Sequence, residues 1–148
     1  MKNTFINKTT TTLTAALIAL AAPMANAQNI QFEINGVNSD KGKLYVQLFK
    51  GETNYEAGKP ESSLIIKAKP GANLVTFNNI EAGEYAVRYF HDENDNGEME
   101  FNLFGMPVEG YGFSNDAQPN FGPAKYKQMK FMVSSDTETV TNKSNVIY

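Results

Sequence analysis

Apolar and polar residues alternate along most of this chain with the two-residue period of β-strands. The clearest examples are residues 43–49 and 84–91, where every second side chain would face a core. No segment beyond the N-terminal leader keeps a 3.6-residue period over ten or more residues, so long helices are not expected. Further strands are predicted at residues 30–34, 64–66, 74–77, 99–104, 127–133 and 139–148.

Short strands separated by glycine, asparagine and proline turns predict an all-β fold. We expect a single Greek-key sandwich of about seven to eight antiparallel strands. Tyr85 stands two residues after Gly83 at the start of a strand, as in a tyrosine corner, whose hydroxyl bonds back to the backbone. Residues 50–62 are predicted to be a polar connection.

The segment from Leu103 to Ala124 has no regular pattern and is rich in glycine, proline and aromatic residues. Long loops of this kind are either functional or folded back on their own side chains. Two interpretations stay open for its block 109–115. Its aromatic side chains either stack on a sugar ring or another protein, or cap one end of the sandwich.

The N-terminus matches a bacterial signal peptide. Residues 1–27 contain two lysines and no acid, and the apolar run Leu13–Ala22 precedes small residues at Ala25 and Ala27. We expect cleavage after Ala27, export to the periplasm or the medium, and one domain over residues 28–148. The apolar run is shorter than the roughly 20 residues of a permanent span, and no second run is longer, so the mature chain is expected to have no membrane span.

Charge is concentrated in one part of the chain. Residues 81–116 hold nine acids against Arg88 alone. Such a segment attracts cations and repels nucleic acid, so no nucleic-acid binding is expected. The chain has no cysteine, which excludes a disulfide framework and a lipid-modified cysteine anchor.

The sharpest motif is the acidic run from Asp92 to Glu100, in which oxygen donors occupy alternate positions before Gly97. Ca²⁺ takes six to eight oxygen ligands, and a D-x-N-x-N-G turn points alternate side chains inward. The run is not an EF-hand, because its twelfth position is Leu103 and strands flank it; Glu109 is a further ligand candidate. The predicted calcium ligands are Asp92, Asn94, Asn96, Glu98 and Glu100.

A second interpretation needs no metal. Asn96-Gly97 is a favoured hairpin turn, and residues 84–91 and 99–104 would then pair as an antiparallel hairpin with the acids as a solvated rim. His91, the only histidine, is expected to end its strand and bond a loop carboxylate or carbonyl. The alternatives for His91 are a transition-metal ligand and an acid–base group.

Several blocks resemble an exported bacterial family catalogued as domain of unknown function 2141 (DUF2141). They are the stretch from Tyr85 to Asn94 with Asn96-Gly97, the run 104–107, the block 109–115 and Phe121-Gly122-Pro123. The resemblance spans roughly residues 30–148 and implies an exported β protein, without a reaction to transfer. The run 82–87 is also similar to transthyretin-like and Cna-B-type sandwiches.

We therefore expect an exported, non-enzymatic β-sandwich module. Its acidic loop would bind Ca²⁺ and order the long loop at 92–124 for contact with an unknown protein or glycan partner. The alternative is a purely structural domain of an envelope or surface assembly, without metal. A second alternative is a carboxylate-based hydrolase, which needs Glu100, Glu109 and His91 in one cleft.

Overall fold

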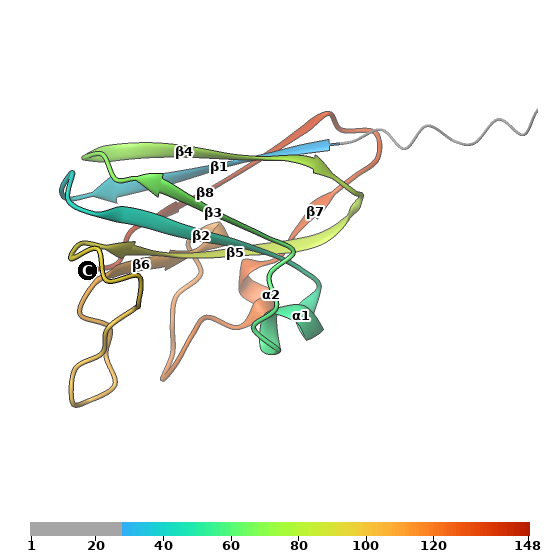
Figure 1. The fold of residues 1–148 in the computed structure, drawn as a ribbon. Helices are drawn as coiled ribbons and strands as arrows, with labels where there is room; N and C mark the ends of the chain where they lie inside the picture. The colour runs from blue at the N-terminus through green and yellow to red at the C-terminus, as the bar shows by residue number, and fades with distance from the viewer. Residues whose placement is uncertain (1–27) are drawn as a thin grey trace, which may run out of the picture.

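The computed structural model describes residues 28–148 and shows two β-sheets packed face to face (Figure 1). The predicted signal peptide and its cleavage site lie outside the described residues. One sheet has the order β4-β1-β8; the other has the order β3-β2-β5-β6, with β7 also paired to β5. The strands are β1 (Gln28–Val37), β2 (Lys43–Lys50), β3 (Ser62–Lys67), β4 (Gly71–Ile80), β5 (Gly83–Asp92), β6 (Gly110–Phe113), β7 (Phe131–Val133) and β8 (Thr139–Asn145).

The two-sheet β architecture predicted from the alternation is confirmed, with one departure in strand direction. All strand pairs are antiparallel except β1 and β8. These two run parallel, with Asn29 paired to Thr139 at one end and Asn35 paired to Asn145 at the other. After β7 the chain leaves the five-stranded sheet and crosses to the other sheet. It then enters beside the start of β1, so β8 has to follow β1 in the same direction.

The main core lies between the sheets and is made by the inward-facing positions of the strands. Fully buried side chains include Phe32 of β1, Leu48 of β2 and Val87 of β5. Tyr85 is buried as well, and its hydroxyl donates to the Glu81 carbonyl at 3.0 Å. The predicted tyrosine corner is therefore confirmed.

A second, smaller core lies on the outer face of the five-stranded sheet, on the side where Figure 1 shows α1 (Glu52–Glu56) and α2 (Tyr126–Met129). It is covered by α1, α2 and the 3₁₀ turn η1 (Ser114–Asp116). The Ser114 hydroxyl oxygen accepts the Val87 N–H at 2.9 Å and the hydroxyl donates to the Met129 carbonyl at 2.6 Å, which fastens η1 to β5 and α2. The buried members of this core are Ala86, Phe113, Ala117, Ala124, Tyr126 and Met129.

Two local predictions were wrong. Residues 99–104 form no strand and contribute only an isolated bridge between Phe101 and Pro107, because the edge of β5 is occupied by β6. Residues 127–133 begin in the helical turn α2, and only β7 is extended. The predicted connection at 50–62 is confirmed between β2 and β3, and it contains the short helix α1, which helps to cover the second core. Within the described part of the chain, no helix has the length and apolar character needed to span a membrane.

Candidate functional site

The acidic loop begins at the last residue of β5, where the Asp92 side chain is completely buried. Its Oδ1 accepts the Asn96 N–H at 3.1 Å and its Oδ2 accepts the Gly97 N–H at 2.9 Å. Gly42 lies against the Asp92 carbonyl so closely that a Cβ would overlap it, and its φ of 63° favours glycine. The loop is therefore wound around one buried carboxylate held at the end of the sheet.

The rest of the loop is a chain of side-chain-to-backbone hydrogen bonds. Asn94 Oδ1 accepts the Asn96 N–H at 3.0 Å, and Asn96 Oδ1 accepts the Glu98 N–H at 2.8 Å. Asn94 Nδ2 also donates to Glu100 Oε2 at 2.7 Å. The bend at Gly97, with φ 78°, is confirmed, but the predicted hairpin between residues 84–91 and 99–104 is wrong.

Glu109 reaches the loop from the residue before β6. Its Oε1 accepts the Glu93 N–H at 3.1 Å, and the Glu100 carbonyl accepts the Val108 N–H at 3.1 Å, so the chain doubles back onto the loop. Glu109 is only 5% exposed, and its Oε2 has no hydrogen-bond partner among the described residues. Burial raises the pKa of this carboxyl above its usual value.

The structure brings together most of the predicted calcium ligands. Asp92, Asn94 and Asn96 share one turn and Glu100 is bonded to Asn94, whereas the exposed Glu98 joins this turn through its backbone N–H. Nowhere in residues 28–148 do three His, Asp or Glu side chains gather closely enough to hold a metal by themselves. A cation here would therefore need amide and backbone oxygens in addition to carboxylates, which suits Ca²⁺ better than a transition metal.

His91 is buried, and both of its ring nitrogens have partners. Nε2 lies 2.8 Å from the Lys41 carbonyl and Nδ1 lies 2.8 Å from the Tyr148 hydroxyl. A carbonyl can only accept, so Nε2 donates to the Lys41 carbonyl, and in the neutral tautomer Nδ1 accepts from the Tyr148 hydroxyl. The predicted bond to a carbonyl is confirmed, but that carbonyl belongs to the turn before β2 rather than to the acidic loop.

The glycine and aromatic block 109–115 is largely a structural element. It forms β6 and η1, not an irregular loop. Gly112 and Gly110 lie where a Cβ would collide with the rings of Tyr89 and Tyr148 respectively, so only glycine fits there. This block packs into the sandwich: Phe113 is buried in the second core, and Tyr111 packs against it as a partly buried side chain.

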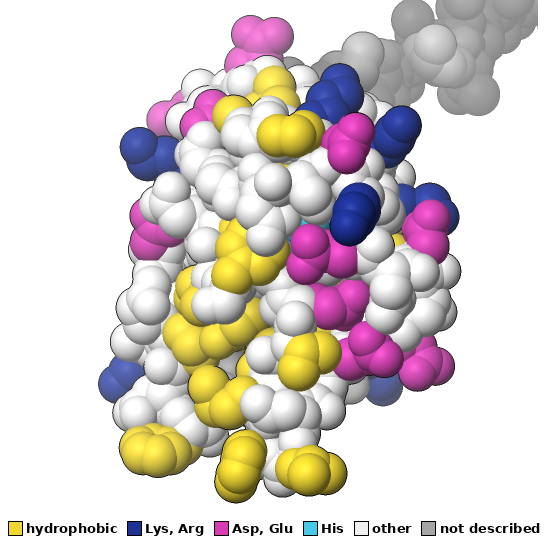
Figure 2. Space-filling model, turned by 90° about the vertical axis from the view of Figure 1, so that its left-hand side faces the viewer, with side chains coloured by type: hydrophobic (Ala, Val, Ile, Leu, Met, Phe, Trp, Pro, Cys, Tyr) yellow, Lys and Arg dark blue, Asp and Glu magenta, His cyan; other side chains and the backbone are white. Residues whose placement is uncertain are grey.

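A cleft of about 670 Å³ lies on the outer face of the five-stranded sheet, beside the acidic loop. Figure 2 shows hydrophobic side chains gathered on this end of the molecule, next to a band of acidic ones. On its floor the rings of Tyr45 and Phe90 stack with centroids 4.9 Å apart. Segments 99–107 and 119–123 form the walls, and His91, Glu100 and Glu109 do not line it.

Sequence reasoning missed this cleft, although a signal was present. The floor comes from the second face of the strands at 43–49 and 84–91, which is itself rich in aromatic residues. A strand that is apolar on both faces is normally covered on both. That signal pointed to a second apolar surface.

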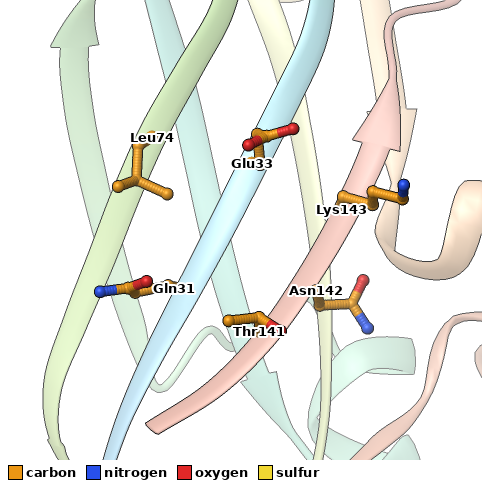
Figure 3. A pocket seen from close by; sticks show the side chains of 6 residues that line it. All are labelled: Gln31, Glu33, Leu74, Thr141, Asn142 and Lys143. Atoms are coloured by element: carbon orange, nitrogen blue, oxygen red, sulfur yellow. The ribbon is translucent and has the colours of Figure 1, made fainter.

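A second depression, on the outer face of the three-stranded sheet, has a different character (Figure 3). Its side chains are mostly polar and are spread along three strands without converging on one point. One of them, Glu33, accepts a hydrogen bond from Asn35 of its own strand at 2.8 Å. The lining residues are Gln31, Glu33, Leu74, Thr141, Asn142 and Lys143.

Fold and site together define a small two-sheet β protein with an acidic loop and an aromatic cleft at one end. A family model described as an uncharacterised protein conserved in bacteria, DUF2141, matches residues 32–141, and the chain belongs to this family. The match includes both the acidic loop and the cleft, and it confirms the resemblance found in the sequence. No curated protein and no solved structure matches the chain.

Proposed function

We propose that this chain is an exported, non-enzymatic β-sandwich module whose loop 92–100 binds Ca²⁺. Binding would order the segment that follows the loop for contact with a protein or glycan partner. The observation that carries the proposal is the buried carboxylate of Glu109, which is aimed at the loop and has one oxygen without a hydrogen-bond partner among the described residues.

The chemistry of the loop supports a hard cation. Each Asp92 oxygen accepts one N–H and retains a second acceptor site, and the loop residues Asn94 and Asn96 are exposed. A buried carboxylate such as that of Glu109 is costly unless an opposite charge approaches it. A cation between Asp92 and Glu109 would supply that charge and would tie the segment 101–107 to the end of the sandwich.

The test is thermal unfolding of the protein in chelator, in Mg²⁺ and in Ca²⁺. The few charged ligands favour a weak site of about 0.1–1 mM, so Ca²⁺ at tenfold excess over Kd should stabilise the protein by about 1.4 kcal/mol. Glu109→Gln keeps the shape and the acceptor for the Glu93 N–H but removes the charge. It should abolish the calcium gain without lowering stability in chelator.

The matched control is Glu33→Gln on the opposite sheet, which should keep the full calcium gain. A melting temperature that is the same in Ca²⁺ and in chelator would reject the site. An equal gain in wild type and Glu109→Gln would reject the ligand role of Glu109.

A structural domain without metal is the second candidate, and one observation favours it. The loop carboxylate and amide oxygens already accept the loop's own N–H groups, so the bend is complete without a cation. In that case Ca²⁺ changes nothing. Gly97→Val still destabilises the protein, because φ at this position is 78°.

Export and fold type complete the proposal. The N-terminal pattern of residues 1–27 supports export, and N-terminal sequencing of the exported protein should begin at Gln28. The tyrosine corner at Tyr85 supports a Greek-key sandwich of the transthyretin or Cna-B type. An experimental structure compared strand by strand with those folds would test that assignment.

A further inference from the structure

Arg88 is the only arginine of the chain, and it lies on the floor of the aromatic cleft. Its guanidinium carbon is 4.8 Å from the centroid of the Phe49 ring and 6.0 Å from that of Tyr55. Its Nε donates to Gln47 Oε1 at 2.8 Å. Burial lowers the pKa of this group, so the site is partly shielded from water.

The guanidinium forms no ion pair within the described chain. The three ion pairs found there all use lysines, at Lys43, Lys50 and Lys130. Nine acids are present in residues 81–116, yet none of them pairs with Arg88. A partly desolvated guanidinium presents a rigid fork of N–H donors whose spacing matches a carboxylate.

The rest of the cleft suits a hydrocarbon. Its volume of about 670 Å³ falls within the range of about 300–1,000 Å³ typical of small-molecule sites. Along the strands, the pair Gln47–Arg88 is followed by the stacked pair Tyr45–Phe90. The walls add large apolar side chains left exposed to solvent, namely Phe101, Met106 and Phe121.

We propose that this cleft binds a monomeric medium-chain carboxylate. The carboxylate pairs with Arg88, and the chain runs over Tyr45 and Phe90 towards the segment 99–107. Few polar groups line the cleft, so a sugar would lose more hydrogen bonds to water than it regains. The acidic loop beside the cleft opposes docking on an anionic bilayer. The proposal does not depend on calcium binding.

Isothermal titration of the protein with sodium decanoate tests the proposal, with decan-1-ol and decyltrimethylammonium as ligands of equal chain length. Decanoate should bind at least tenfold more tightly than either, because an ionic hydrogen bond to Arg88 is available only to the acid. Arg88→Gln should weaken decanoate binding by at least tenfold, and Arg88→Lys by less. Lys143→Gln, on the opposite outer face, should leave it unchanged.

A second variant keeps the proposal testable if Arg88→Gln does not fold. Met106→Ser changes an exposed wall residue, so it should weaken decanoate binding while leaving the unfolding curve unchanged. The proposal is overturned if decanol binds as well as decanoate, or if Arg88→Gln binds decanoate like the wild type. It is also overturned if the protein binds phosphatidylglycerol vesicles but not decanoate. The same holds if the protein self-associates through the cleft and binds no decanoate.

Discussion

The two outer faces of the sandwich are made of the same kind of strand and have opposite chemistry. The outer face of the three-stranded sheet presents side chains such as Gln31, Glu33 and Thr141 to solvent (Figure 3). The outer face of the five-stranded sheet presents the stacked rings of Tyr45 and Phe90. Among residues 28–148, the segments α1, α2, 99–107 and 119–123 lie on this second face.

The difference explains where the irregular parts of the sequence go. Strands that are polar on one face can leave that face in water, whereas strands that are apolar on both faces need a second cover. Here α1, α2 and η1 cover one end of the five-stranded sheet, and segments 99–107 and 119–123 border the rest. The cleft is the part of the second apolar face that this cover leaves open.

The largest effect is expected from Gly112→Ala, because this glycine of β6 lies opposite Tyr89 and faces the core that the five-stranded sheet shares with the other sheet. The new Cβ would collide with the buried ring of Tyr89, which should lower the free energy of unfolding by about 1–3 kcal/mol. Thr141→Ala on the polar face should change it by less than about 0.5 kcal/mol. Urea denaturation measures both.

A double variant identifies the cause of the Gly112 effect. The atom nearest to the new Cβ is the Tyr89 hydroxyl oxygen, so the cost of Gly112→Ala should be smaller in a Tyr89→Phe background. Equal costs in both backgrounds would show that Tyr89 is not the obstacle. A cost as small as that of Thr141→Ala would show that the core around Tyr89 accommodates a Cβ at this position.

A smaller effect is expected from truncating the aromatic floor. Phe90→Ala removes a half-buried ring and its stacking on Tyr45, and should lower the free energy of unfolding by about 1–2 kcal/mol. The control is Leu74→Ala on the polar face, where the side chain is 58% exposed and the change should be about 0.5 kcal/mol or less. Comparable losses of stability in Phe90→Ala and Leu74→Ala would mean that the Phe90 ring does not stack on Tyr45 in solution.

The sequence predicted the strands whose pattern is local. Residues 43–49 and 84–91 alternate clearly and became β2 and β5, and the tyrosine corner followed from Tyr85 and its preceding glycine. β6 escaped prediction because it is four residues long and two of them are glycines, required by the distant rings of Tyr89 and Tyr148. Residues 99–104 alternate, but β6 holds the edge that they would need.

In the candidate sites too, local features were predictable from the sequence and contacts between distant segments were not. The turn around Asp92 was predictable, because Asn94, Asn96 and Gly97 act within a few residues. The environment of Glu109 was not predictable, because it depends on the segment before β6 folding back onto the acidic loop. The cleft was less predictable still, since its walls and its floor come from segments far apart in the sequence.

The smallest effect concerns the charge beside the aromatic face. Burial holds the pKa of Glu109 above its unfolded value, so the native state binds more protons than the unfolded state in the window between the two values. In chelator, the free energy of unfolding should therefore fall as the pH rises from the ordinary glutamate pKa through the raised one, and level off above it. The slope from one carboxyl cannot exceed about 1.4 kcal/mol per pH unit.

Matched variants separate this slope from that of the other acids. Glu109→Gln should flatten the profile in this window, because it removes the buried titrating group and keeps its shape. Glu33→Gln, on the exposed polar face, should keep the Glu109 contribution unchanged. Denaturant unfolding at a series of pH values measures the difference between each variant and the wild type. If Glu109→Gln followed the wild-type profile, the Glu109 carboxyl would be solvated in solution. The surroundings of the two outer faces would then differ in shape but not in their effect on a carboxyl pKa.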